Sequence, residues 1–218
     1  MLGLLFGDPM LFLVILFAII FALSFHEFAH AYAGYLQGDT TAERAGRLTL
    51  NPLSHIDWVG LLLLVTVGFG WGKPVPFNPH NLRNKKWGPV IVALAGPGSN
   101  LLLALVFTGI FHLLSAVTSL PASNALIVFI VFSIIINIAL MLFNLMPIPP
   151  LDGSRLINIF FDAPKYAKLR WRLETQGVWV LLGIIMADAI FDIGIFSGLF
   201  NLVTNLSCNV LLGGAACI

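Results

Sequence analysis

The chain alternates long apolar stretches with short polar ones, and its longest apolar stretches have the length of membrane-spanning helices. A helix needs about 20 apolar residues to cross the hydrocarbon core of a bilayer. Four segments meet this requirement, over roughly residues 10–36, 89–117, 124–146 and 177–206. The pattern predicts an all-α polytopic membrane protein with about four transmembrane helices, in a single membrane-embedded domain that covers residues 1–218.

A fifth apolar stretch, residues 59–69, is too short to cross the membrane as a helix. Glycine and proline residues interrupt this stretch and the positions that follow it, namely Gly60, Gly68, Gly70, Gly72 and Pro74. We therefore expect about residues 43–80 to form an irregular re-entrant or β-hairpin-like segment. Backbone of that kind persists at membrane depth only where protein or a wet cavity covers it.

The composition supports a membrane location. Hydrophobic residues make up 59% of the chain and charged residues only 10%, whereas a soluble domain carries about 25% charged residues. The formal net charge of +1 lacks the basic excess that nucleic-acid binding requires. No basic segment precedes the first apolar run and no small-residue cleavage site follows it, so we expect no secretory signal peptide.

The positions of the basic residues predict how the chain is oriented. All eleven Lys and Arg residues fall within 44–86 and 155–172, and none lies at either terminus or between the second and third predicted spans. By the positive-inside rule, both basic regions are cytoplasmic and both termini lie outside. Aromatic and basic residues over 160–174 further predict an interfacial helix that binds lipid headgroups. Near the C-terminus, Cys208 and Cys217 could form a disulfide or remain two free thiols.

Ionisable side chains interrupt the first predicted span in the sequence FHEFAH, residues 25–30. His26 and His30 are four residues apart, so a helix presents both imidazoles on one face, with Glu27 beside them. The pattern H-E-x-x-H is typical of two zinc ligands and a general base. Zinc lowers the pKa of bound water to about 7. Glu27 could then accept a proton and return it to a leaving amine.

An alternative for this cluster is a pair of buried structural histidines that form a salt bridge with the glutamate. Ionisable groups inside an apolar span are costly and usually functional. The metal site is therefore the favoured interpretation.

A catalytic zinc usually has three protein ligands and a water, so two histidines leave one position to fill. Asp152 follows the sequence NLMPIPPL, residues 144–151, whose prolines exclude a helix and favour an extended chain. A ligand on such a stiff segment would be preorganised. The alternative is that Asp152 caps a short helix that continues through Arg155. The residues alone do not choose between the two.

Five motifs occur in the order seen in the site-2 proteases, which are zinc metalloproteases that cut within membranes, and the chain resembles that family from about residue 26 to 153. The motifs are HEFAH, NPLSHIDWVG, FGWGKPVPFNP, AGPGSN and FNLMPIPPLDG. The resemblance implies one Zn²⁺ per chain, held by His26, His30 and Asp152, with Glu27 as the base. It also implies that Asn144 lies near the zinc and donates to the oxyanion, although Asn144 could simply cap its helix. The resemblance is to the compact bacterial or archaeal subgroup, without an inserted PDZ-type or an appended CBS-type domain.

The sequence PVPFNP, residues 74–79, cannot be helical and forms either a tight loop or a strand-like edge. The resemblance favours an edge at Pro74, Val75 and Pro76 that binds an extended substrate. For His55 a structural role is favoured over a ligand role, and for Asn100 a hydrogen bond between helices. In the last predicted span, two aspartates could face an aqueous groove or mark a helix break, namely Asp188 and Asp192.

These features together predict an intramembrane zinc metalloprotease that hydrolyses peptide bonds within or next to transmembrane segments, as in regulated intramembrane proteolysis. Its partners would be the lipid bilayer of a bacterial or archaeal cell and a membrane-protein substrate with a transmembrane helix. A zinc transporter or metal-binding channel is the alternative, since ligands in spans also mark ion pathways. Transport, however, predicts several ligand sets along a path. An inactive scaffold is a third option, against which the intact HEFAH and LDG motifs argue.

Overall fold

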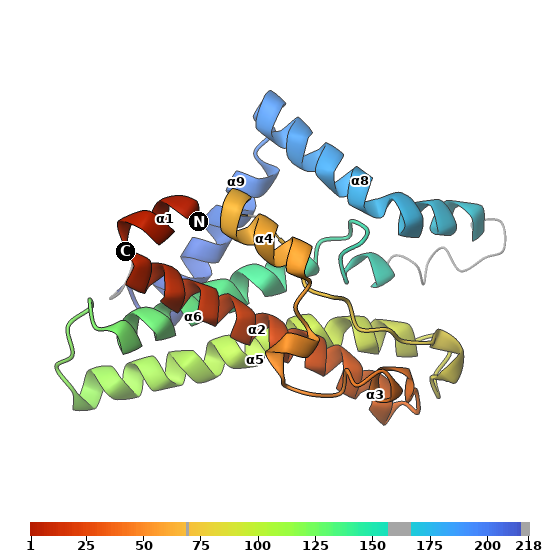
Figure 1. The fold of residues 1–218 in the computed structure, drawn as a ribbon, viewed down its shortest axis with the longest axis horizontal. Helices are drawn as coiled ribbons and strands as arrows, with labels where there is room; N and C mark the ends of the chain where they lie inside the picture. The colour runs from red at the N-terminus through yellow and green to blue at the C-terminus, as the bar shows by residue number, and fades with distance from the viewer. Residues whose placement is uncertain (69, 157–166, 215–218) are drawn as a thin grey trace.

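The computed structural model describes residues 1–68, 70–156 and 167–214, and within these residues it is built from helices (Figure 1). Among the described residues, three helices are long and apolar enough to cross a membrane, α2 (Pro9–Leu36), α5 (Gly88–Val117) and α6 (Ala125–Asn144). All three pack against one another and form the centre of the fold. The predicted all-α membrane fold is therefore confirmed.

Local capping explains where these helices begin. The Asp8 carboxylate accepts a hydrogen bond from the Leu11 amide, 3.0 Å away, and Pro9 occupies the first turn of α2. Asn124 caps α6 in the same way through the Leu126 amide. A short helix, α1 (Leu2–Gly7), precedes α2.

Apolar side chains join the central helices and also cover their outer faces. Phe107 and Phe111 of α5 pack with Ile130 and Ile134 of α6 in one buried cluster. Large apolar side chains on the outside of the bundle remain exposed, as at Leu102, which is 63% exposed. Such an outer surface is suited to lipid rather than water.

The segment expected to be re-entrant or hairpin-like contains short helices joined by loops. These are α3 (Thr41–Arg44), η1 (Pro52–Ser54), α4 (Trp58–Val67) and η2 (Pro79–Asn81). The apolar run that is too short to span the membrane forms α4, which Gly68 ends at a φ of 89°. In place of the expected hairpin, the described residues form an isolated antiparallel β-bridge between Ile56 and Gly72.

The fourth expected span, 177–206, is not one continuous helix. The structure divides it into α8 (Ala167–Phe191) and α9 (Ile195–Thr204), followed by η4 (Asn205–Leu211), a short π-helix. The Asp188 carboxylate accepts hydrogen bonds from the first two amides of α9, and Asp192 and Gly194 have positive φ angles of 50° and 86°. Of the two interpretations of these aspartates, the helix break is the one the structure supports, because a carboxylate can satisfy the free amides of a new helix.

Two sequence predictions concern residues that the structure covers only in part. The interfacial helix expected over 160–174 lies partly outside the described residues, and α8 begins at Ala167. Cys208 is buried in η4, whereas Cys217 lies outside the described residues.

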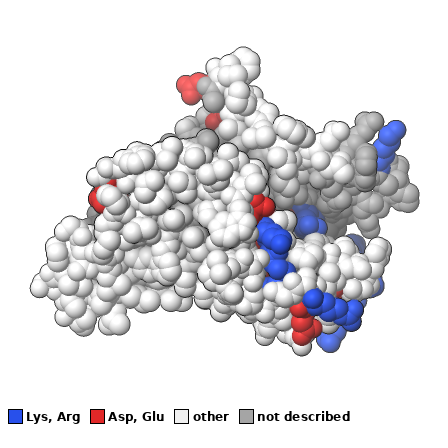
Figure 2. All heavy atoms as spheres, viewed as in Figure 1, with Lys and Arg blue, Asp and Glu red and all other residues white. Residues whose placement is uncertain are grey.

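The basic residues gather toward one end of the bundle. On the face shown in Figure 2, Lys and Arg occupy the half that contains α3 and the N-terminal ends of α5 and α8. The half containing the connection between α5 and α6 shows neither on this face. The two basic regions of the sequence therefore lie toward the same end of the three long helices.

Candidate metal and active site

Three potential ligand atoms, from segments 122 residues apart, converge beside α2. His26 Nε2 and His30 Nε2 lie 3.0 Å apart, and Asp152 Oδ2 lies 3.2 Å from the first and 3.1 Å from the second. A tetrahedral zinc with bonds of about 2.0–2.1 Å needs ligand atoms roughly 3.3 Å apart. The spacing of these three atoms therefore suits zinc.

The hydrogen bonds behind the two imidazoles indicate which ring nitrogen carries the proton. His26 Nδ1 lies 2.6 Å from the Asn100 side-chain oxygen, and His30 Nδ1 lies 2.7 Å from the Val92 carbonyl oxygen. Because both oxygens are acceptors, each neutral ring donates from Nδ1 and presents a lone pair at Nε2. Two lone pairs and a carboxylate oxygen would repel one another at these distances, and a cation between them removes that repulsion. The donor set thus fits a metal ion.

A buried pair of amides fixes the orientation of Asn100. Its Nδ2 donates to Asn137 Oδ1 at 2.8 Å, and Asn137 Nδ2 donates to the Ser133 carbonyl at 2.8 Å. Both asparagines are fully buried. The expected interhelical hydrogen bond of Asn100 is present and also positions His26. Asn137 was not predicted as a functional residue, although an amide in the middle of an apolar span is a recognisable signal.

Gly96 allows α5 to approach the two histidines. A Cβ atom at this position would lie 2.3 Å from His30 Nε2 and 2.6 Å from His26 Cε1. Any side chain here would therefore occupy the space between the imidazoles and α5. This close approach explains the first glycine of the AGPGSN motif.

A tight return of the chain after α6 brings Asp152 to the histidines. The Gly153 amide donates to the Asn144 carbonyl at 2.7 Å, and a Cβ on Gly153 would lie 2.2 Å from the Leu145 carbonyl oxygen. The preceding prolines exclude a helix as expected, but the chain makes a series of turns and is not extended. The Asp152 carboxylate contacts the two imidazoles, which favours its interpretation as a ligand over that as a helix cap.

Glu27 is buried beside this cluster, and the 74–76 segment holds its carboxylate. The Val75 amide donates to Glu27 Oε2 at 3.1 Å. Pro74 and Pro76 have no amide hydrogen, so the one backbone donor of the expected substrate-binding edge is already used. In this arrangement, residues 74–76 can offer a substrate only their carbonyl oxygens.

Loop residues hold the start of this segment at Lys73. Its amide donates to the His55 carbonyl at 2.9 Å, and its carbonyl accepts from the buried Arg47 guanidinium. His55 donates from Nε2 to the Thr49 carbonyl at 2.7 Å, in agreement with a structural role. Burial lowers the pKa of the Arg47 guanidinium, and the negative charge of Glu27 works against that shift.

Asp39, just beyond the end of α2, holds the other end of the segment. Its carboxylate accepts hydrogen bonds from the Asn78 amide at 2.6 Å, the Asn81 side chain at 3.0 Å and the Thr41 amide at 3.1 Å. Burial raises the pKa of the Asp39 carboxyl, but these hydrogen bonds and that of the Thr41 hydroxyl outweigh burial and hold the pKa below its ordinary value. Nothing in the sequence analysis singled out Asp39 for this role.

Asn144 contributes two hydrogen bonds at the end of α6. Its Nδ2 donates to the Leu140 carbonyl within the same helix at 3.0 Å. Its backbone carbonyl accepts from Gly153 and so supports the turn that carries Asp152. Its role as an oxyanion donor stays a prediction.

Part of the chain matches the sequence model of a known protein family. A sequence model described as Peptidase family M50 matches residues 109–187, a stretch that includes Asp152 but not the H-E-x-x-H motif. No solved structure matches the chain significantly.

Curated proteins from three bacteria are similar to this chain. The chain is 41% identical over 167 residues to a Bacillus subtilis protein named "Putative zinc metalloprotease YwhC". The aligned residues cover 75% of this chain and 76% of that protein. It is 33% identical over 148 residues to "Putative zinc metalloprotease Rip2" of Mycolicibacterium smegmatis, with 65% and 55% covered. The protein of the same name from Mycobacterium tuberculosis is 32% identical over 136 residues, with 61% and 51% covered. The chain thus spans about half of the length of the mycobacterial relatives.

The long match to the Bacillus relative agrees with the convergence of two histidines and an aspartate beside the first long helix. The chain therefore belongs to peptidase family M50, the site-2 proteases, and it is a membrane metalloprotease whose cofactor is zinc.

Proposed function

We propose that this protein is an intramembrane protease, in which His26, His30 and Asp152 hold the zinc and Glu27 is the general base. The observation that carries the proposal is the triangle of three ligand atoms, 3.0 to 3.2 Å apart, beside a helix long enough to span a membrane. Zinc bound there would polarise the scissile carbonyl and lower the pKa of a water molecule.

The remaining chemistry is that of the chain's own residues. Glu27 takes a proton from the attacking water and delivers it to the nitrogen of the leaving amine. The Val75 amide holds Glu27 Oε2, so Oε1 is the oxygen that we assign to proton transfer. Anchoring one carboxylate oxygen keeps the base in a fixed orientation, which is what efficient proton transfer requires.

The substrate would be a transmembrane segment that is extended near the bond to be cut. A helical carbonyl is hydrogen-bonded within its own helix and is shielded from attack. The carbonyls of the exposed residues Pro74 and Pro76 are candidate partners for the substrate's amides, because unpaired amides cost several kcal/mol in lipid. Water would enter from the end of the bundle with the basic residues, which we infer to be cytoplasmic.

A transport function is less well supported. Transport needs successive ligand sets, and within the described parts of the chain the candidate cluster is that of His26, His30 and Asp152. A glutamate held beside the cluster supplies the general base that hydrolysis needs.

The test is Glu27→Gln, assayed on a library of single-span membrane proteins in liposomes, with Glu43→Gln on the exposed surface of α3 as the matched control. We expect Glu27→Gln to abolish cleavage and to retain about one zinc per chain, because the proposed ligands remain. Cleavage sites mapped by mass spectrometry should fall within or beside the substrate's span. Undiminished cleavage by Glu27→Gln would remove Glu27 from the mechanism, and loss of zinc would make it a ligand.

A further inference from the structure

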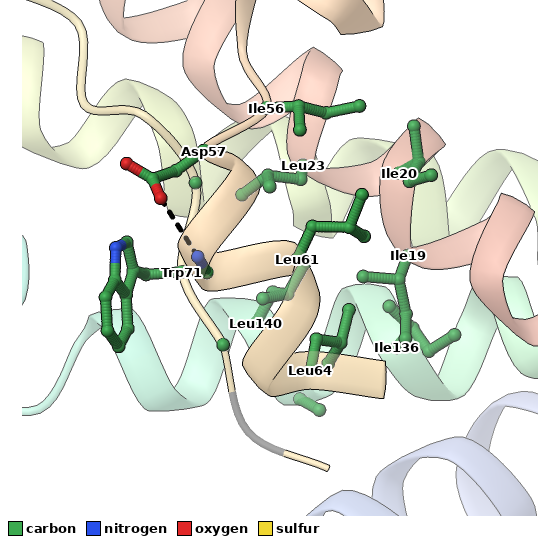
Figure 3. A pocket seen from close by; sticks show the side chains of 14 residues that line it. Ile19, Ile20, Leu23, Ile56, Asp57, Leu61, Leu64, Trp71, Ile136 and Leu140 are labelled. Atoms are coloured by element: carbon green, nitrogen blue, oxygen red, sulfur yellow. Dashed lines mark hydrogen bonds between the residues drawn. The ribbon is translucent and has the colours of Figure 1, made fainter. Parts of the chain in front are cut away.

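An apolar pocket of about 260 Å³ lies between α2, α4, α6 and the chain at residues 70–72 (Figure 3). Its walls are built mainly from aliphatic side chains, including Ile19, Leu23, Leu61, Leu64 and Leu140. The pocket is separate from the cluster of histidines, and the mechanism above does not use it.

The chemistry of the lining excludes a charged ligand. Among the residues that line the pocket, Asp57 carries the charge, and its carboxylate is committed to the first turn of α4. It accepts hydrogen bonds from the amides of Val59 at 3.0 Å and Gly60 at 2.9 Å, the latter drawn in Figure 3. An apolar group is therefore what the pocket can bind.

The pocket adjoins the proposed active site through three elements. Leu23 lies four residues before Glu27 on the same face of α2, which corresponds to about 6 Å along the helix axis. Gly72 lies three residues before Val75, the residue that holds Glu27. On α6, the Leu140 carbonyl accepts a hydrogen bond from the Asn144 side chain.

Close backbone contacts fix the wall formed by residues 70–72. A Cβ atom on Gly72 would lie 2.8 Å from Leu23 Cδ2, and one on Gly70 would lie 2.2 Å from the Gly60 carbonyl oxygen. A Cβ on Gly60 would in turn lie 2.1 Å from the Trp71 carbonyl oxygen. Glycines therefore let this chain pack directly on α2 and α4, so the pocket has a defined shape.

We propose that this pocket is a specificity subsite, which receives one large apolar side chain of the substrate from a residue close to the cleaved bond. The inference rests on the proposed proteolytic function. The pocket is smaller than the roughly 300–1,000 Å³ of sites for drug-sized ligands, and it suits a single branched aliphatic or aromatic side chain. Side chains alternate in an extended segment, so only one residue near the cut can point into it.

The experiment measures kcat/KM in liposomes for substrates that carry Ala, Leu, Phe or Asp at each position flanking the cut. At one position, the wild type should cleave the Leu and Phe substrates with a kcat/KM at least tenfold above that of the Ala substrate, because their side chains bury more apolar area. The Asp substrate should have the lowest kcat/KM of the four. Ala139→Phe fills the pocket and should reverse this order by lowering the rates for Leu and Phe. Leu64→Ala enlarges the pocket and should raise the rate for Phe relative to Leu. Ala116→Phe, on the exposed end of α5, is the matched control and should keep the wild-type order.

The outcomes separate the subsite from the function on which it rests. An unchanged order of substrates in both pocket variants, with zinc content retained, would overturn the subsite. An equal fall for all substrates would do the same, and would indicate that a lipid chain or the packing of the fold occupies the pocket. If Ala139→Phe fails to fold, Leu64→Ala decides alone. Absence of cleavage of every substrate by the wild type would instead refute the proposed proteolysis.

Discussion

At the scale of single residues, each histidine of the candidate metal site is held from behind by an oxygen acceptor. Asn100 holds His26 and the Val92 carbonyl holds His30. Such contacts fix the orientation of a ligand and raise its basicity. The properties of this site therefore depend on residues that would not contact the metal.

Substitution of Asp152 tests whether it is the third ligand of the candidate metal site. Replacing it with Ala should lower zinc occupancy and proteolysis together, because two imidazoles alone bind zinc weakly. Asp57→Ala is the matched control for zinc content, since its carboxylate caps α4 and contacts neither histidine in the described structure. Zinc content per chain, measured by metal analysis, gives the answer. Full zinc in Asp152→Ala would restore the interpretation of Asp152 as a helix cap.

Substitution of Asn100 tests whether its hydrogen bond with His26 contributes to metal binding. Asn100→Ala removes the acceptor that holds the His26 Nδ1 proton, and it should weaken zinc binding about 10- to 100-fold. Competition with a chelator measures this affinity. Thr108→Val, which also removes a polar group from α5 but lies away from the site, should keep the wild-type affinity. Equal zinc affinity in Asn100→Ala and the wild type would show that the hydrogen bond is not needed to bind the metal.

At the scale of elements, two buried charged residues position the segment that holds the general base. Arg47 holds Lys73, Asp39 holds Asn78, and the Val75 amide between them bonds to Glu27. The loop between α2 and α3 and the loop before α4 therefore act together, through the segment before α5, on a residue of α2. No single element builds this part of the site.

Asp39→Asn tests this anchoring through its dependence on pH. The folded pKa of Asp39 lies below the unfolded value of about 3.9, so its stabilisation is complete above that value and is lost as pH falls through the folded pKa. We expect Asp39→Asn to lower stability by about 2 kcal/mol at neutral pH, with a smaller difference from the wild type below about pH 4. Thermal unfolding in detergent from pH 3 to 8 measures this. A difference that does not vary with pH would contradict a role for the charge.

At the scale of the whole molecule, the basic residues gather at one end of a bundle whose outer surface is largely apolar (Figure 2). Positive charge remains on the cytoplasmic side during insertion. The arrangement therefore agrees with cytoplasmic placement of the segments around Lys85 and Lys168, while the connection around Ala122 would lie outside.

Cysteine labelling tests this topology. On a background without Cys208 and Cys217, a cysteine at position 122 should react with an impermeant thiol reagent added to intact cells. Cysteines at positions 85 and 168 should react only after the membrane is opened, because the reagent cannot reach the cytoplasm. Labelling in the reverse pattern would overturn the orientation.

Features that depend on local spacing could be predicted from the amino-acid sequence. A run of about twenty apolar residues predicts a spanning helix from its length, as it did for α2, α5 and α6, and residues four apart lie on one face of any helix. The long helices and the pairing of His26 with His30 could therefore be predicted. The motifs, taken together, also predicted the family and its metal.

Features that join distant segments depend on the folded arrangement of the chain. Asp152 reaches the histidines across 122 residues through a turn that Gly153 permits, and Val75 meets Glu27 because two separate loops hold its segment. The break between α8 and α9 likewise depends on whether the Asp188 carboxylate turns toward the amides that follow it. Hydropathy carries no information about such contacts, because they depend on where the folded chain brings each donor and acceptor.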